Sequence, residues 1–176
     1  DNKIADYAAK GHIVPSRDII KNANQIDKIK ESAKINVAVL DYIEKNIHEG
    51  MTTAEIDKIV YDMTTEMGGI PAPLNYEGYP ASLCVSINDE VVHGIPNKKR
   101  ILREGDIVSV DVGAYYKGFH GDCAATYPCG KISPQAQTLI DVTKQSFFEG
   151  LRFAKKGYRV SDISHAIQTY VESNGF

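Results

Sequence analysis

The sequence predicts an α+β domain in which helices cover an antiparallel sheet. Two amphipathic helical patterns, over residues 25–49 and 52–67, precede every strand pattern. Residues 107–129 then have the form of a long hairpin, and two more helical patterns follow. Separate runs of helices and strands are typical of an α+β fold.

Capping residues support the two leading helices. In the first, apolar residues recur three and four positions apart between Asn24, the expected N-cap, and Gly50, the expected stop. In the second, Thr52 and Glu55 have the spacing of a capping box, and a glycine pair ends the pattern. Both helices therefore have a polar side and an apolar side, and the apolar side is expected to pack on another element of the fold.

Later segments complete the predicted domain. Residues 82–87 favour a strand, and Ser133 followed by proline favours the start of a helix that reaches about residue 156. A last helix is expected over residues 161–174. Residues 1–24 are polar and lack sustained periodicity, so we interpret them as an extended or disordered leader of unknown role. The structured domain then spans residues 25–176.

The composition excludes several classes of protein. The net charge of −3 is spread along the 176 residues without a long basic run, so nucleic-acid binding is not expected. No apolar stretch approaches the roughly 18 residues of a membrane span, and no signal peptide is present. The three cysteines form no C-x-x-C pair. We expect a cytoplasmic protein with reduced thiols.

Two aspartates occupy the predicted hairpin. With a two-residue turn at 117–118, residues whose numbers sum to 235 face each other, so Asp122 lies opposite Gly113. Asp111 is two residues further along on the same face, with its Cβ about 7 Å from that of Asp122. Two such anions repel each other unless one is protonated or a cation lies between them.

A pair of divalent metal ions is the simplest resolution of that repulsion. Carboxylate-bridged metals roughly 3.5–4 Å apart activate water for hydrolysis, and oxygen ligands completed by imidazole suit manganese, iron, cobalt or zinc. The alternative is that Asp111 and Asp122 are ordinary polar residues on a solvated sheet face.

His93 is the next candidate for chemistry. It follows a strand-like Val-Val pair and precedes Gly-Ile-Pro, which can aim the imidazole into a cleft as donor, acid or ligand. The alternative is a structural histidine. We assign His120 to the face opposite Asp122 and give it no role, and strand alternation excludes Cys123 from the carboxylate face.

Three more residues are best interpreted, from their own positions alone, as packing residues. Cys84, in the strand 82–87, is by default a small buried hydrophobe. Tyr76 and Tyr79 are packing residues by default, although loop aromatics beside glycine and proline can line an apolar subsite.

Together these segments resemble a known family. The matching motifs are Asn75-Tyr-Glu-Gly-Tyr-Pro80, Ser82-Leu-Cys-Val-Ser-Ile-Asn88, Val92-His-Gly-Ile-Pro96, Gly105-Asp-Ile-Val108, Val110-Asp111 and Gly118-Phe-His-Gly-Asp122. In order and spacing they are similar to the type I methionine aminopeptidases, from about residue 22 to the end of the chain. The resemblance implies a pita-bread fold, with two pseudo-symmetric halves around a metal cleft.

The resemblance also implies roles for the candidate residues. Asp111 and Asp122 match two of five metal ligands, with Asp122 bridging, and His93 matches a histidine that hydrogen-bonds substrate near the scissile amide. Walls of the methionine side-chain pocket are implied for Tyr76, Tyr79 and Cys84.

The implied reaction removes an N-terminal methionine when the second residue is small. A hydroxide bridging two divalent ions (cobalt, manganese, iron or zinc) attacks the peptide carbonyl. Nascent peptides are the implied partners, with a transient ribosome contact and a monomeric complete enzyme. The family's remaining ligands, a histidine and two glutamates, fall after the last residue here. We therefore expect residues 25–176 to be the N-terminal half of the catalytic domain, and the chain alone to bind metal weakly without turnover.

Three alternatives stay open. A prolidase-like Xaa-Pro peptidase or a non-catalytic binding protein shares the implied fold, and a soluble domain with a polar hairpin explains the spacing without a metal. The substitution Asp111→Asn separates them, because only a metalloenzyme loses activity while keeping its fold.

Overall fold

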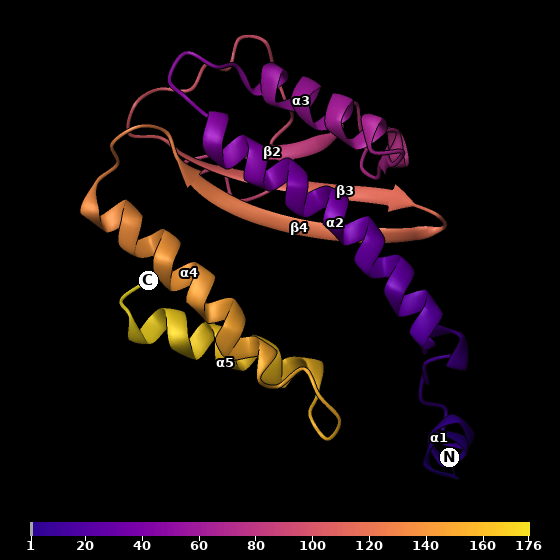
Figure 1. Cartoon of the computed structure of the whole chain (residues 1–176). Coiled ribbons are helices and arrows are strands. Elements are labelled where there is room, and N and C mark those ends of the chain that lie inside the picture. The colour runs from indigo at the N-terminus through magenta and orange to yellow at the C-terminus, as the bar shows by residue number, and fades with distance from the viewer. Residues whose placement is uncertain (1) are drawn as a thin grey trace.

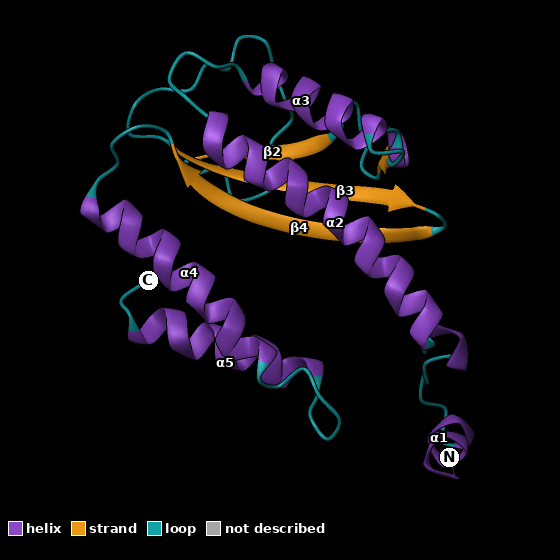
Figure 2. Ribbon diagram, in the orientation of Figure 1, coloured by secondary structure: helices purple, strands orange, loops and turns teal. Residues whose placement is uncertain are grey.

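Two helices cover one face of a four-stranded antiparallel sheet in the computed structural model, which describes residues 2–176 (Figure 1). Helix α2 (Ala23–Asn46) packs on the two long strands, and α3 (Thr53–Glu66) packs beside it over the shorter strands. The layers are a sheet and a helical cover, as the colouring of Figure 2 shows. The predicted α+β class is confirmed.

The sheet is built around one central strand. Strand β3 (Ile107–Tyr116) pairs along its whole length with β4 (Phe119–Pro128). Strands β1 (Ile70–Pro71) and β2 (Leu83–Ile87) also pair with β3. Since β4 takes one edge of β3 completely, β1 and β2 occupy successive parts of the other edge.

The hairpin has the predicted register. Partners run from Ile107 with Pro128 to Tyr116 with Phe119, so every pair sums to 235. The turn residues Lys117 and Gly118 both have positive φ, at 49° and 86°. This is the type I′ pattern, whose twist matches that of the flanking strands.

Strand alternation places the hydrophobic core on the helical side of the sheet. In β3 the even-numbered residues Val108, Val110 and Val112 are 2% exposed or less. They meet buried side chains of the two helices, namely Ile35, Val39 and Ile43 from α2 and Ile56 and Val60 from α3. Burial of each such side chain contributes about 1.5–3 kcal/mol to folding.

Helix α2 begins earlier than predicted. Its N-cap is Asn22, not Asn24, because Asn22 accepts from the Gln25 amide at 3.0 Å while the Gln25 side chain accepts from the Asn22 amide at 2.9 Å. The reciprocal pair needs glutamine at the third helical position, which only Asn22 provides. The capping box of Thr52 and Glu55 at α3 is confirmed.

The leader is partly helical, which corrects the prediction of an extended or disordered arm. Residues Asn2–Ala9 form α1, and Arg17–Ile19 form a short 3₁₀ turn. The prediction was wrong for α1 because eight alanine-rich residues favour a helix by propensity yet are too few to display a periodic pattern. Figure 1 shows α1 beyond the end of α2, apart from the sheet.

Two helices follow the sheet. Helix α4 (Pro134–Leu151) begins at the predicted N-cap Ser133, and α5 (Val160–Ser173) packs against it as a hairpin. Helix α4 ends five residues before the expected position near 156, because tighter i to i−3 bonds to Gly150 and Leu151 turn the chain back. Within residues 2–176, no helix combines the length and apolar character that crossing a membrane requires.

Candidate metal site on the open face of the sheet

Asp111 and Asp122 project from the sheet face that α2 and α3 leave uncovered. In β3 the odd-numbered residues take this face, and the register brings β4 residues with even numbers to the same side. Asp122 lies opposite Gly113, two pairs along from Asp111, as the spacing predicts. The two carboxylates are therefore diagonal neighbours on adjacent strands.

The pKa of Asp111 reflects its partial burial and the charged residues near it. Partial burial raises the pKa of the Asp111 carboxyl, the negative charge of Asp122 raises it further, and the positive form of His93 lowers it. Desolvation and a like charge both disfavour the ionised form, and their combined effect exceeds the opposing effect of His93. His93 is close enough to interact, although it comes from a different segment of the chain.

Two more predicted residues lie beside Asp111. Cys84 is its direct partner on β2, and Tyr79 donates its hydroxyl proton to the Leu83 carbonyl at 2.9 Å. Burial raises the pKa of Tyr79, and its hydrogen bond with Cys84 and the charge of Asp111 raise it further. The phenol therefore stays a neutral hydrogen-bond donor at physiological pH.

His93 reaches this face from a loop rather than from a strand. The strand-like Val91 and Val92 form no strand, and they are 85% and 62% exposed. The backbone bond from this segment to β2 comes after the valines, where the Val85 amide donates to the Gly94 carbonyl at 2.9 Å, so the valines themselves form no ladder. His93 itself has a φ of 61°, in the left-handed region.

The remaining predicted residues are placed differently. Tyr76 is 69% exposed in a 3₁₀ turn and makes no side-chain hydrogen bond among residues 2–176. The prediction for His120 was wrong, because residues two apart in a strand share a face and His120 therefore lies on the same face as Asp122. The His120 ring packs beside the Tyr115 ring, with 4.9 Å between the ring centroids. The exclusion of Cys123 is confirmed, since it packs on the helical side.

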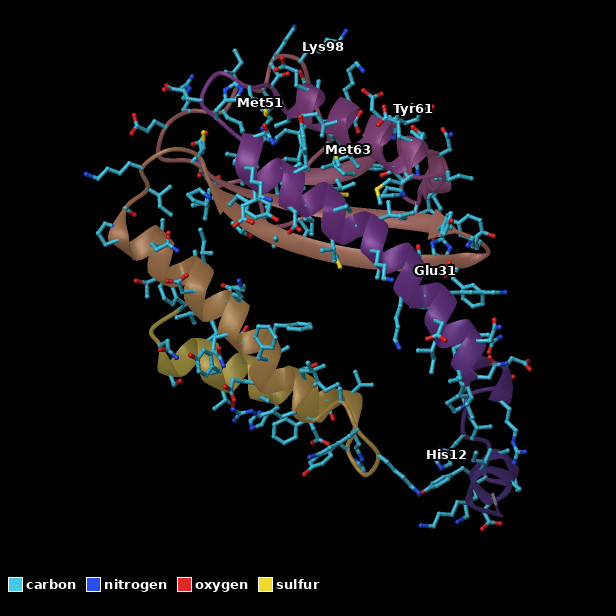
Figure 3. All side chains as sticks on the ribbon, viewed as in Figure 1. His12, Glu31, Met51, Tyr61, Met63 and Lys98 are labelled. Carbon is cyan, nitrogen blue, oxygen red and sulfur yellow. The ribbon has the colours of Figure 1, made fainter. Side chains whose placement is uncertain are left out.

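The cluster offers two carboxylates but no third protein ligand. Among the described residues, no three His, Cys, Asp or Glu side chains gather as a metal site requires. Figure 3 shows His12 beside α1, far from the strands. Two oxygen donors fit a hard divalent cation, but these residues by themselves do not complete a two-metal centre.

Comparison with known proteins decides the family. The model of "Metallopeptidase family M24" matches residues 27–176, which is most of the chain. This chain belongs to metallopeptidase family M24.

Curated relatives in family M24 carry a more specific name. The chain is 49% identical over 158 residues to a methionine aminopeptidase of Clostridium acetobutylicum, and 44% identical over 158 residues to methionine aminopeptidase 1 of Bacillus subtilis. Each match covers 90% of this chain. The chain spans 63% of the length of each relative.

Solved structures of the M24 family have the same fold. A methionine aminopeptidase from Thermotoga maritima matches with a TM-score of 0.85 and 40% identity, covering 89% of this chain and 63% of that one. One from Rickettsia prowazekii also gives 0.85, with 35% identity and coverage of 88% and 62%. A prolidase from Pyrococcus furiosus, 17% identical, shares the fold alone. The pita-bread prediction is confirmed.

Sequence reasoning missed one residue that positions this M24 site. Asp57 of α3 accepts a hydrogen bond from the amide of Ser82 at 2.7 Å, at the start of the strand that carries Cys84. Burial raises the pKa of Asp57, and the Ser82 bond opposes that rise. Helical periodicity could have found it, because Asp57 lies on the same helical face as the buried Val60 and Thr64.

The substitution Asp57→Asn tests this role through pH. The pKa of Asp57 is raised in the folded state, so ionising Asp57 destabilises the fold. The stability of the protonated form is fully present below the ordinary aspartate pKa of about 4, and it is lost as the pH rises through the folded-state pKa. Asparagine keeps the acceptor for Ser82 without the charge. We expect Asp57→Asn to be at least as stable as the parent at pH 7, with the difference vanishing below pH about 4.

Asp57→Ala serves as the comparison, because it leaves the buried Ser82 amide without a partner. It should lose about 1–3 kcal/mol of unfolding free energy, measured by urea denaturation at both pH values. Equal stability of the alanine and asparagine variants would contradict the role of the Ser82 bond.

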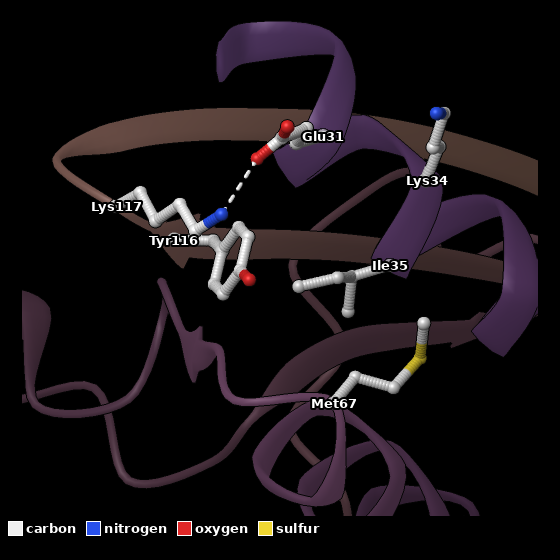
Figure 4. A pocket seen from close by; sticks show the side chains of 6 residues that line it. All are labelled: Glu31, Lys34, Ile35, Met67, Tyr116 and Lys117. Atoms are coloured by element: carbon white, nitrogen blue, oxygen red, sulfur yellow. Dashed lines mark hydrogen bonds and ion pairs between the residues drawn. The ribbon is translucent and has the colours of Figure 1, made fainter.

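A cavity of about 330 Å³ lies on the other side of the sheet from the carboxylates. It is lined by Glu31, Lys34, Ile35, Met67, Tyr116 and Lys117. Figure 4 shows the ion pair of Glu31 with Lys117, 3.0 Å long, at its edge. Tyr116 is on the helical side of β3, so this hollow is separated from Asp111 by the sheet itself and does not belong to the carboxylate cluster.

Proposed function

We propose that this protein is a metal-dependent aminopeptidase that removes the N-terminal methionine from proteins whose second residue is small. The observation that carries the proposal is the convergence of Asp111 and Asp122 on one open sheet face, with His93 beside Asp111. The relatives at 49% and 44% identity, both named methionine aminopeptidase, support it.

The proposed ligands are the carboxylates of Asp111 and Asp122, with Asp122 as the bridging one. Two divalent ions, from among cobalt, manganese, iron and zinc, are the proposed cofactors, since these ions accept carboxylate and imidazole ligands. When bound, such ions polarise a carbonyl and lower the pKa of water. The chain's own contribution is to hold two anions close together where a cation relieves their repulsion.

The other residues are proposed to bind substrate. His93 would hydrogen-bond the peptide near the scissile amide, since its loop brings the imidazole close to Asp111. Tyr79 and Cys84 would form one wall of the methionine pocket, and the exposed Tyr76 another. An apolar pocket of this kind discriminates between side chains by only about 1–3 kcal/mol.

The proposed setting follows from the substrate. Nascent proteins carry the initiating methionine, so we place the activity in the cytoplasm, with a transient contact to the ribosome and a monomeric complete enzyme. Nucleic acid is not a proposed partner, since the net charge is −3.

The test compares the 176-residue chain with the product of the complete gene. Isothermal titration with Mn²⁺ or Co²⁺ should give weak binding to the chain, because the described residues offer two carboxylates and no third ligand. The complete product should bind tightly and release methionine from a Met-Ala-Ser peptide in a metal-dependent manner.

A Xaa-Pro dipeptide is the matched control substrate. Cleavage of the dipeptide with no release of methionine would replace the proposal by a prolidase activity. A complete product that binds metal but cleaves neither substrate would contradict an enzymatic role. Rapid metal-dependent release of methionine by the 176-residue chain would contradict the inference that this chain has too few metal ligands for catalysis.

A further inference from the structure

The backbone of His93 is held in a conformation that the residue does not adopt freely. Its φ of 61° lies in the left-handed region, where Cβ crowds the backbone of every residue except glycine. A non-glycine residue adopts this conformation uncommonly, so contacts of its neighbours help to keep it there. The contacts of the next residue, Gly94, show what imposes it.

Gly94 is bound to β2 on one side. Its carbonyl accepts from the Val85 amide at 2.9 Å, and its own amide donates to the Ser86 hydroxyl at 3.1 Å. A Cβ at this position would lie 2.0 Å from the Val85 carbonyl oxygen. The loop therefore approaches the strand as closely as a glycine backbone allows.

A carboxylate lies on the same side of Gly94 as the Val85 carbonyl. Oε2 of Glu90 lies 2.6 Å from where a Gly94 Cβ would be, so the carboxylate packs directly on this residue. Nη1 of Arg100 contacts both oxygens of Glu90, at 2.8 Å and 2.6 Å. The pair is about two-thirds buried, with 35% and 32% of the two side chains exposed.

Arg100 is in turn fixed to the start of α3. Its carbonyl accepts from the Thr53 amide at 2.9 Å. The Thr53 hydroxyl accepts from the Asn97 amide at 2.8 Å, and Thr53 is fully buried. A continuous series of contacts thus joins α3, through Arg100 and Glu90, to the residue after His93.

We propose that the Glu90–Arg100 ion pair is a positioning device that holds His93 toward Asp111. The Glu90 carboxylate lies against Gly94 and accepts from the Ile87 amide of β2 at 3.3 Å, so the pair ties the loop to the strand and keeps its left-handed residue from relaxing. Neither side chain is proposed to touch substrate. The positioning role rests on the proposed function of His93, but the placement of the imidazole can be measured without activity.

The first measurement is the NMR signal of the His93 imidazole in the 176-residue chain. The chain has five histidines, and His93→Gln identifies the resonance. We expect Arg100→Met and Glu90→Gln to shift and broaden the His93 resonance while leaving the other four unchanged. Arg100→Lys should restore the parental signal, because a single nitrogen of Arg100 makes both contacts and an ammonium can replace it.

Arg152→Met is the matched control. Arg152 pairs with Glu149 at 2.9 Å in the α4 region, far along the chain from this loop. It should leave the His93 signal unchanged. An unchanged His93 resonance in folded Arg100→Met and Glu90→Gln would overturn the proposal. Complete unfolding of both variants would also overturn it, because the ion pair would then support the whole fold rather than the position of His93.

The second measurement uses methionine release by the product of the complete gene. Displacement of His93 should lower kcat by roughly 10- to 100-fold in Arg100→Met, with recovery in Arg100→Lys. If the parent releases no methionine, the proposed function fails, and the NMR result still decides the positioning role. An altered His93 signal with unchanged kcat would overturn the functional part of the proposal.

Discussion

Asp111→Asn is expected to reduce methionine release by more than about 100-fold in the product of the complete gene. Loss of a residue that merely orients a metal ligand already costs roughly 10- to 100-fold, and Asp111 is proposed as a ligand itself. Asparagine has nearly the same shape but carries no charge, so it binds a divalent cation poorly. Metal affinity, measured by titration calorimetry, should fall together with activity.

The fold should survive this change or become more stable. Partial burial and the charge of Asp122 both raise the pKa of Asp111, which means that its ionised form is disfavoured in the folded chain. That penalty is absent below the ordinary aspartate pKa of about 4 and appears as the pH rises. Thermal unfolding at pH 7 without metal should therefore give Asp111→Asn a Tm no lower than the parent.

Asp41→Asn is the control for charge removal alone, because Asp41 is exposed on α2 and is not one of the candidate site residues. It should leave activity and metal affinity unchanged. Full activity of Asp111→Asn would refute the metal-ligand role and favour the reading of an ordinary polar hairpin.

Gly121→Ala is expected to have a large effect on stability. A Cβ on Gly121 would lie 2.7 Å from the backbone nitrogen of Ala33 and 2.8 Å from its Cα, where α2 crosses β4. Backbone atoms cannot rotate out of the way, so the helix must lift from the sheet. The unfolding free energy should fall by about 3 kcal/mol, at the upper end of the cost of overpacking.

Gly113→Ala is the matched comparison in the same hairpin. Its Cβ would come closest to the Cβ of Ala72, at 3.1 Å, with Pro73 and the Gly121 carbonyl at ordinary van der Waals distances of 3.6 Å and 3.8 Å. A shift of a few tenths of an ångström relieves this contact, so we expect a loss below about 1 kcal/mol in urea denaturation. Equal losses for the two variants would show that glycine conformational freedom, rather than helix contact, sets the stability of the hairpin.

The hairpin shows how far local pattern reaches. A two-residue turn containing glycine sets which residues pair, and a period of two sets which share a face, so Asp111 and Asp122 could be paired from their numbers. The misplacement of His120 was an error in applying that same rule. Helix starts were less secure, because Asn22 and Asn24 are both capping residues and only Asn22 has glutamine three positions later.

The position of His93 shows where local pattern ends. The two valines before it favour a strand by propensity, yet only the following Gly94 bonds to β2, and the valines remain exposed. The loop is set instead by its contacts with Ser86 of β2 and by Glu90 and Arg100, which connect it to the distant Thr53 of α3. No spacing rule connects those residues before the chain folds.

The sequence by itself determined the α+β class, the hairpin register and the shared face of the two aspartates, because these depend on steric periods and turn geometry within short segments. Tertiary structure decided that Asp57 supports β2, that His93 and Cys84 lie beside Asp111, and that Tyr76 is exposed. The physical reason is that burial and charge act between segments far apart in the chain. Burial and charge shift the pKa of a side chain such as Asp111 only after folding has packed other segments against it and excluded water from one side.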